Sequence, residues 1–340
     1  MTTKIEISTS TLVRIALFLL GVWFLFAIRD VLVLLFLVLI IVAGLSPTVD
    51  RWAKTITRPG AVVSVFVIIF VLLGMIFSLI IPPFIDQLQQ FSANLPAYTE
   101  KLSQQPSGFL SSMADVAVRN INQISSYLSN IGEFLFTRTV GVVSGVVAVI
   151  TVIVLSFYLL LEEDGLRRIY KGILPAEWHG ALAETTRKIT GKLGSWVRGQ
   201  LLLMLIVGVL ITLGLLIVGS DYALSLGVWA GLTEVVPILG PWLGAIPGVI
   251  VGLVASPLQG FLVLIVYIIV QQLEGNIIVP KVMSKAVGLN PFIVILAILV
   301  GGKLYGLMGI LLGVPMAAVI SVIAEDWQVI RHTFGSSRKS

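Results

Sequence analysis

Cysteine is absent from this chain, and histidine occurs only twice, at His179 and His332. Without cysteine there can be no disulfide, no thiolate nucleophile and no cysteine-ligated zinc or iron–sulfur centre. The sequence also lacks an HExxH motif and a Walker A motif, which removes the common zinc-protease and phosphate-binding signatures. We therefore predict that the protein is not an enzyme and has neither a metal site nor a cofactor.

Charged residues are also scarce. Only 11% of the 340 residues are charged and 57% are hydrophobic, whereas about 25% of the residues of an average soluble domain are charged. So few charges cannot cover a water-soluble globule of this size. The net charge of +5 does not indicate a nucleic-acid partner, because the basic residues lie between long apolar runs. The composition predicts an all-α polytopic membrane protein whose partner is the lipid bilayer.

The apolar runs predict about seven to eight transmembrane helices, since about 20 residues at 1.5 Å each cross the hydrocarbon core. In the C-terminal half some runs are short or broken, which predicts re-entrant or broken helices there. Only Arg29 and Asp30 separate the first two runs, and this spacing predicts a tight helical hairpin. The runs cover residues 12–28, 31–45, 61–85, 140–161, 200–219, 222–239, 242–255, 258–270 and 291–324.

The distribution of basic residues predicts the orientation, because cytoplasmic loops carry an excess of Lys and Arg. If the N-terminus is cytoplasmic, the segments at 51–58, 162–199 and 281–285 place most of the 22 basic residues inside. Both termini are then cytoplasmic. For the C-terminus to lie on the cytoplasmic side, residues 291–324 must fold back near Lys303, although the sequence also permits one long helix.

Two polar segments interrupt the apolar runs. Within residues 86–138, apolar residues recur in steps of three and four, which predicts an extracytoplasmic amphipathic helix. It would either pack on its own spans or form a self-association surface. Within residues 162–199, similar spacing predicts an amphipathic helix on the inner leaflet, or alternatively a docking site. The predicted organisation is three spans (1–85), the first polar segment (86–138), a fourth span (139–161), the second polar segment (162–199), a Gly/Pro-rich core (200–325) and a tail (326–340).

Ionisable residues inside a membrane are costly, so each is a candidate functional residue. Glu234 is flanked by apolar sequence, where desolvation favours a protonated carboxyl, and this makes it a candidate proton carrier. Pro237, Gly240 and Pro241 are expected to break the helix and to free carbonyl groups for a cation or a polar solute. Alternatively, Glu234 is paired locally and holds a structural kink.

A second polar cluster ends the apolar run at 258–270. Gln271, Gln272, Glu274 and Asn276 enter the membrane boundary together, and Gln271 and Glu274 share a helix face. They could line the mouth of a transport pathway or form a polar helix end with an interhelical hydrogen bond. Pro280 and Lys281 complete this candidate region.

Three segments together resemble the autoinducer-2 exporter family, also called the PerM/YdiK-like permeases. They are EVVPILGPWLGAIP at 234–247, EGNIIVPKVM at 274–283 followed by VGLNP at 287–291, and GGKLYGLMG at 301–309. The resemblance implies a multi-pass transporter of a bacterial or archaeal inner membrane, ion- or proton-coupled and homo-oligomeric. Family members are described as exporting autoinducer-2, and others as exchanging sodium or lithium for protons. A passive channel and a membrane scaffold that transports nothing are alternatives.

Overall fold

The computed structural model describes residues 9–103, 139–162, 179–286 and 288–327, and these residues are helical apart from short connections. Within these described residues, six helical segments are long and apolar enough to cross a membrane, and three shorter apolar helices accompany them. The fold class is therefore that of an all-α polytopic membrane protein, as the sequence predicts. The elements are α1 (Thr9–Ala27), α2 (Arg29–Trp52), α3 (Arg58–Ser103), α6 (Thr139–Leu161), α8 (His179–Ile217), α9 (Ala223–Thr233), α10 (Leu239–Ala255), α11 (Pro257–Leu273), the π-helical turn η2 (Glu274–Ile278), α12 (Val279–Ala286) and α13 (Pro291–Glu325).

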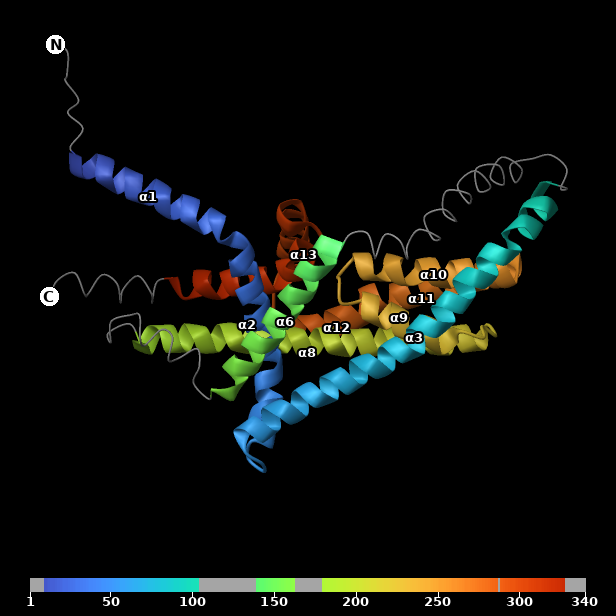
Figure 1. Ribbon diagram of the computed structural model, residues 1–340, viewed down its shortest axis with the longest axis horizontal. Coiled ribbons are helices and arrows are strands. Elements are labelled where there is room, and N and C mark those ends of the chain that lie inside the picture. Colours follow the sequence, from blue (N-terminus) through green and yellow to red (C-terminus); the bar gives the residue numbers. More distant parts are fainter. Residues whose placement is uncertain (1–8, 104–138, 163–178, 287, 328–340) are drawn as a thin grey trace, which may run out of the picture.

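Three clusters of buried apolar side chains hold the helices together. One cluster joins α2, α3 and α6, a second joins α2, α8 and α13, and a third joins α8, α9 and α11. Two helices therefore connect the clusters: α2 belongs to the first and second, and α8 to the second and third. Figure 1 shows α8 running along the long axis of the molecule and crossing α2.

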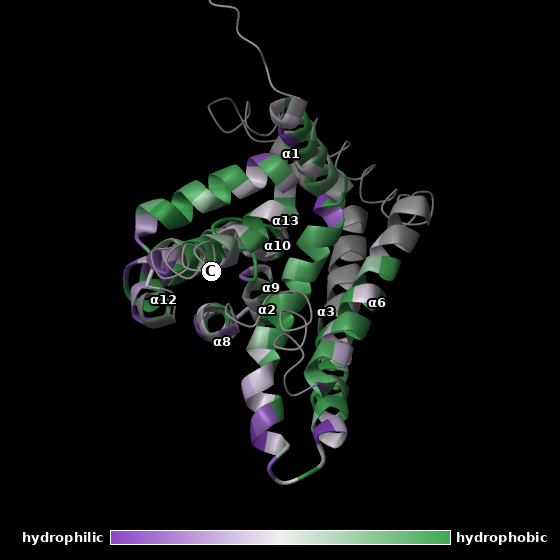
Figure 2. Ribbon diagram, turned by 90° about the vertical axis from the view of Figure 1, so that its left-hand side faces the viewer, coloured by the Kyte–Doolittle hydropathy of each residue, from purple (hydrophilic) through white to green (hydrophobic). Residues whose placement is uncertain are grey.

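The exposed surface is largely hydrophobic, as expected for helices that face lipid. Figure 2 shows hydrophobic residues along α1, α2 and α6, with hydrophilic residues gathered near the turn between α2 and α3. In that turn region Arg58 donates hydrogen bonds to Asp50 and to the backbone oxygen of Leu160, which ties the end of α6 to the start of α3.

The predicted hairpin of the first two helices is wrong. Only Ile28 separates α1 from α2, and helical hydrogen bonds from Ile28 to Phe24 and from Leu32 to Ile28 continue through the junction. No residue of the Ser10–Ala27 segment is buried, and Figure 1 shows α1 pointing away from the other helices. The helical hydrogen bonds continue past Arg29 and Asp30. These two residues therefore lie at a bend in the helix and not at a reversal of the chain.

The polar segments also differ from the predictions. Residues 86–103 continue the third helix, so that α3 extends to Ser103, whereas the apolar stripe predicted beyond it lies outside the described residues. Residues 179–199 form the first half of α8 and are continuous with the next span. Leu193 and Trp196 are buried against α2 and α13 instead of lying on a leaflet. Their helical spacing reflects packing within the chain.

Helix α13 is a hairpin, which answers the alternative left open by the sequence. Its backbone leaves helical geometry at Tyr305 and Gly306, and Gly306 has a φ of 57° that glycine adopts readily. The two arms meet at glycines: a Cβ atom on Gly309 would overlap the backbone of Gly301, and one on Gly313 would lie 2.7 Å from Ala297 O. The reversal lies just beyond Lys303, where the charge pattern places it.

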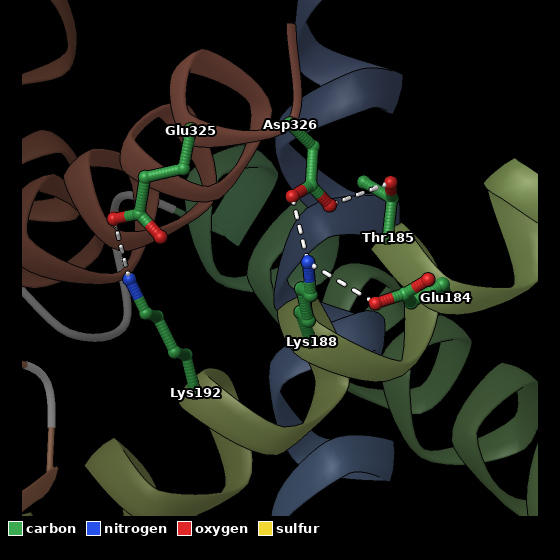
Figure 3. A network of polar contacts seen from close by, with 6 residues as sticks. All are labelled: Glu184, Thr185, Lys188, Lys192, Glu325 and Asp326. Carbon is green, nitrogen blue, oxygen red and sulfur yellow. Dashed lines mark hydrogen bonds and ion pairs between the residues drawn. The ribbon is translucent and has the colours of Figure 1, made fainter. Parts of the chain in front are cut away.

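A polar network joins the first half of α8 to the end of α13 (Figure 3). Lys188 Nζ lies 2.7 Å from Asp326 Oδ1 and 3.3 Å from Glu184 Oε1, and Thr185 Oγ1 donates to Asp326 Oδ2. One turn along α8, Lys192 pairs with Glu325. Hydrogen bonds from Lys188 and then Thr185 hold the pKa of the Asp326 carboxyl below its ordinary value.

Asp326→Asn is expected to lower the thermal midpoint of the purified protein by a few degrees, because the buried Asp326 carboxylate loses its charge-assisted bonds. Since the folded pKa is depressed, the stabilisation is present above the unfolded pKa and is lost as pH falls through the folded pKa. The difference between wild type and variant should therefore begin to shrink as the pH falls below about 4 and vanish below the lowered pKa of folded Asp326. Glu184→Gln, which removes the exposed partner of the same lysine, is the control and should change little. A midpoint difference that is independent of pH would contradict this account.

Candidate functional site

The first element of the candidate site is a break between two short helices. Helix α9 ends at Thr233 and α10 begins at Leu239, so that Glu234 and Pro237 lie in the connection. Ile238 has a φ of 69°, a conformation that β-branched residues rarely adopt and that stores strain. Pro241 lies in the first turn of α10, where its missing N–H is not needed. The break therefore precedes Pro241.

Two neighbours fix the backbone of Glu234. Gln200, buried in α8, donates a hydrogen bond of 2.6 Å from its Nε2 to the backbone oxygen of Glu234. Gly240 packs directly on the connection, because a Cβ atom there would overlap Thr233 O and lie 2.8 Å from Glu234 Cα. The Glu234 side chain is thus presented from a connection whose main chain is held on two sides.

The second element begins where α11 changes its helical geometry. Glu274 is the first residue of the π-helical turn η2, a type of turn that is frequent at functional sites. Glu274 and Glu234 are only 5% and 3% exposed, and their carboxyl groups lie within hydrogen-bonding reach of each other. Two buried carboxyl groups at one site can share a proton, which makes this pair a candidate proton-binding site.

The paired carboxyls open onto a cavity of about 440 Å³ between α8, α9, α10 and α11. This volume lies within the range of about 300–1,000 Å³ typical of small-molecule sites. Most of the lining is apolar, with Trp242 contributed by α10. The polar side chains that line it are Glu234, Tyr267, Gln271, Gln272 and Glu274. A small solute could be held there by few, directed polar contacts.

The structure brings together most of the residues singled out from the sequence. Glu234, Pro241, Gln271, Gln272 and Glu274 line the cavity, whereas Pro237 and Gly240 shape the connection beside it. The remaining candidates do not line this cavity: Asn276 is exposed and donates hydrogen bonds to Gln272, and Pro280 and Lys281 lie in α12.

Two polar residues of the site were missed by the sequence reasoning. Tyr267 precedes Gln271 and Glu274 by four and seven residues, and this helical spacing could have identified it. Gln200 opens an apolar run at a point where a polar residue is unusual, but its contact with Glu234 depends on how α8 and α9 pack. In the described part of the chain, no cluster of three or more His, Cys, Asp or Glu residues could hold a metal ion.

The chain is similar in sequence to a family of transporters and to several named proteins. The model of the AI-2E family transporters matches residues 12–328. YueF of Bacillus subtilis (strain 168) is 31% identical over 289 residues, which cover 81% of this chain and 78% of YueF. PerM of Escherichia coli (strain K12) is 26% identical over 288 residues, covering 82% and 79%. A protein of Halobacillus andaensis named sodium-lithium/proton antiporter is 25% identical over 352 residues, covering 94% and 96%.

The long apolar helices indicate a multi-pass membrane protein, and the matching family and the relatives named as transport protein and permease give the transporter class. The family match over nearly the whole chain gives the particular group: the chain belongs to the AI-2E transporter family.

Proposed function

We propose that this protein moves a small polar solute across the inner membrane of a bacterium or archaeon, as an exporter coupled to protons or another ion. The observation that carries the proposal is the Glu234–Glu274 carboxyl pair, which faces a small cavity at a broken helix. An apolar cavity with few polar groups suits a small organic solute. Autoinducer-2 is the first solute to test, because the family is named for it.

In the proposed mechanism, the solute binds in the cavity and the carboxyl pair exchanges its proton as the cavity changes its access. Ile238 is strained and Glu274 begins a π-helical turn, so both elements of the site have irregular backbone. Irregular backbone at membrane depth is held in place by surrounding contacts, and strained segments cluster where proteins change conformation. This supports a conformational change at the site. The connection at Glu234 is the part expected to move. Helix α8 forms its support, because Gln200 of α8 holds the backbone of Glu234.

Exchange of sodium or lithium for protons is the second candidate. The carboxyl pair favours it, because a monovalent cation can replace the shared proton between two carboxylate oxygens. The antiporter of Halobacillus andaensis covers nearly the full length of both chains, which adds support.

The proposed orientation places the C-terminus and the segments at 51–58 and 162–199 in the cytoplasm. Two contacts support it, because each joins segments that the charge pattern assigns to the cytoplasmic side: Arg58 with Leu160, and Lys188 with Asp326. The predicted cytoplasmic N-terminus depended on a reversal at Arg29–Asp30, which the structure replaces with a bend. We also propose that the protein assembles as a homo-oligomer, in line with the family resemblance.

Efflux from proteoliposomes tests the proposal. Purified protein is reconstituted, autoinducer-2 is loaded inside, and its release is followed with and without an imposed proton gradient. We expect gradient-dependent release by the wild type, and release without gradient dependence by Glu234→Gln, which cannot exchange a proton at that position. Protein-free vesicles give the background leak.

The other outcomes distinguish the alternatives. Sodium-dependent proton movement in the same vesicles, without release of autoinducer-2, would favour the antiporter. Fast downhill flux that ignores every imposed gradient would indicate a passive channel. Absence of any flux, combined with a stoichiometric partner captured by crosslinking, would replace the proposal with a scaffold.

A further inference from the structure

Tyr267 is a buried hydroxyl-bearing residue at the interface of α10 and α11. Its side chain is 7% exposed and belongs to the apolar cluster of α8, α9 and α11. The ring lies against Gly248 of α10, where a Cβ atom would approach Tyr267 Oη to 2.6 Å. A glycine at this position therefore leaves the space that the hydroxyl end of the ring fills.

The Tyr267 hydroxyl has no hydrogen-bond partner in the described part of the chain. A buried hydroxyl without a partner destabilises a protein, and Phe would fill the same space without this penalty. Packing alone thus gives no reason for a tyrosine here. Each unpaired polar atom of this kind requires an explanation, and a ligand is one of the few.

A second unpaired polar atom lies in the same cavity. Glu234 Oε2 is fully buried and also receives no hydrogen bond within the described residues. Tyr267, Gln271 and Glu274 follow one another at helical spacing on one face of α11 and its π-helical turn, and all three line the cavity. Tyr267, which carries the unpaired donor, and Glu234, which carries the unpaired acceptor, therefore line the same cavity.

We infer that Tyr267 is a specificity-determining residue of the cavity, whose hydroxyl hydrogen-bonds the transported solute at a point separate from the carboxyl pair. This inference rests on the proposed transport function. The solute must then carry a polar atom for Tyr267 as well as a group that Glu234 or Glu274 can bind. Gly248 positions the tyrosine, because a side chain there would displace the ring.

Tyr267→Phe tests the inference, since it removes one oxygen and keeps the ring. In the proteoliposome assay with autoinducer-2 as the probe, the variant should raise the KM by about tenfold, the effect of losing a hydrogen bond to a bound solute. The maximal rate and its dependence on the proton gradient should persist, because the carboxyl pair is unchanged. The thermal midpoint of the solute-free variant should equal or exceed that of the wild type.

Tyr158→Phe is the matched control, because Tyr158 in α6 is exposed and does not line the cavity. It should leave the KM unchanged. A purely structural role of Tyr267 predicts a lowered thermal midpoint and an unaltered KM, and that pair of results would overturn the inference. Absence of flux in the wild type contradicts the proposed function, whereas normal wild-type flux with an unaltered KM in Tyr267→Phe contradicts only the role of Tyr267.

Discussion

Glu234→Gln and Glu274→Gln are each expected to reduce gradient-driven transport by at least about tenfold, equivalent to about 1.4 kcal/mol. An amide preserves the shape of the side chain, but it can neither share a proton with the opposite carboxyl nor release one. Both proteins should still fold, because Gln200 and Gly240 hold the main chain of the connection and not the Glu234 side chain. Removing a charge from an apolar cavity is also expected to leave stability unchanged or to raise it.

The double variant distinguishes a pair from two independent groups. If the two carboxyls act as a unit, Glu234→Gln/Glu274→Gln should be no slower than the slower single variant, because the second change removes nothing further. Glu325→Gln, at the exposed end of α13, is the control and should retain wild-type rates. Wild-type rates in both cavity variants, with normal insertion, would remove these residues from the mechanism.

Gly309→Ala is expected to separate the two arms of α13. The added methyl would overlap the backbone of Gly301, and backbone atoms cannot turn aside as the end of a flexible side chain can. Overpacking of this kind typically costs about 1–3 kcal/mol. The variant should show a lowered thermal midpoint, and its transport should fall as well, because α13 packs against the helix that anchors the Glu234 connection.

Gly74→Ala provides the comparison for this substitution. Gly74 lies within α3, and nothing comes within 4 Å of a Cβ atom built there. The same glycine-to-alanine change in a helix should therefore leave the thermal midpoint unchanged or slightly raised. Equal midpoints for Gly74→Ala and Gly309→Ala would show that the two arms do not meet as described.

The sequence predicted the membrane class and most of the cavity residues because both depend on local signals. Long apolar runs and an isolated buried carboxylate, Glu234, can be read directly from the chain. The reversal in α13 was also accessible, since charge parity and the glycines around Lys303 indicate it. By contrast, the sequence offered no means of recognising that Glu234 and Glu274 are neighbours, because 40 positions separate them and only helix packing joins them.

The errors arose where one pattern fits two environments. Leu193 and Trp196 occur at the spacing of an amphipathic helix, and that spacing serves a membrane surface and a neighbouring helix equally well. The pair Arg29–Asp30 between two apolar runs predicts a reversal, although a charged pair can also remain helical at a bend. In each case the decision depended on tertiary contacts that local periodicity does not encode.

Helix α8 has a mechanical consequence for any transport cycle. Its 39 residues form one uninterrupted rod, on which Lys188 contacts the end of α13 and Gln200 contacts the connection at Glu234. These two points are about 18 Å apart along the rod. The rigid helix that supports the connection at Glu234 is therefore also held at the end of α13. A change at the contact between Lys188 and Asp326 would therefore alter the support of the cavity from a point outside it.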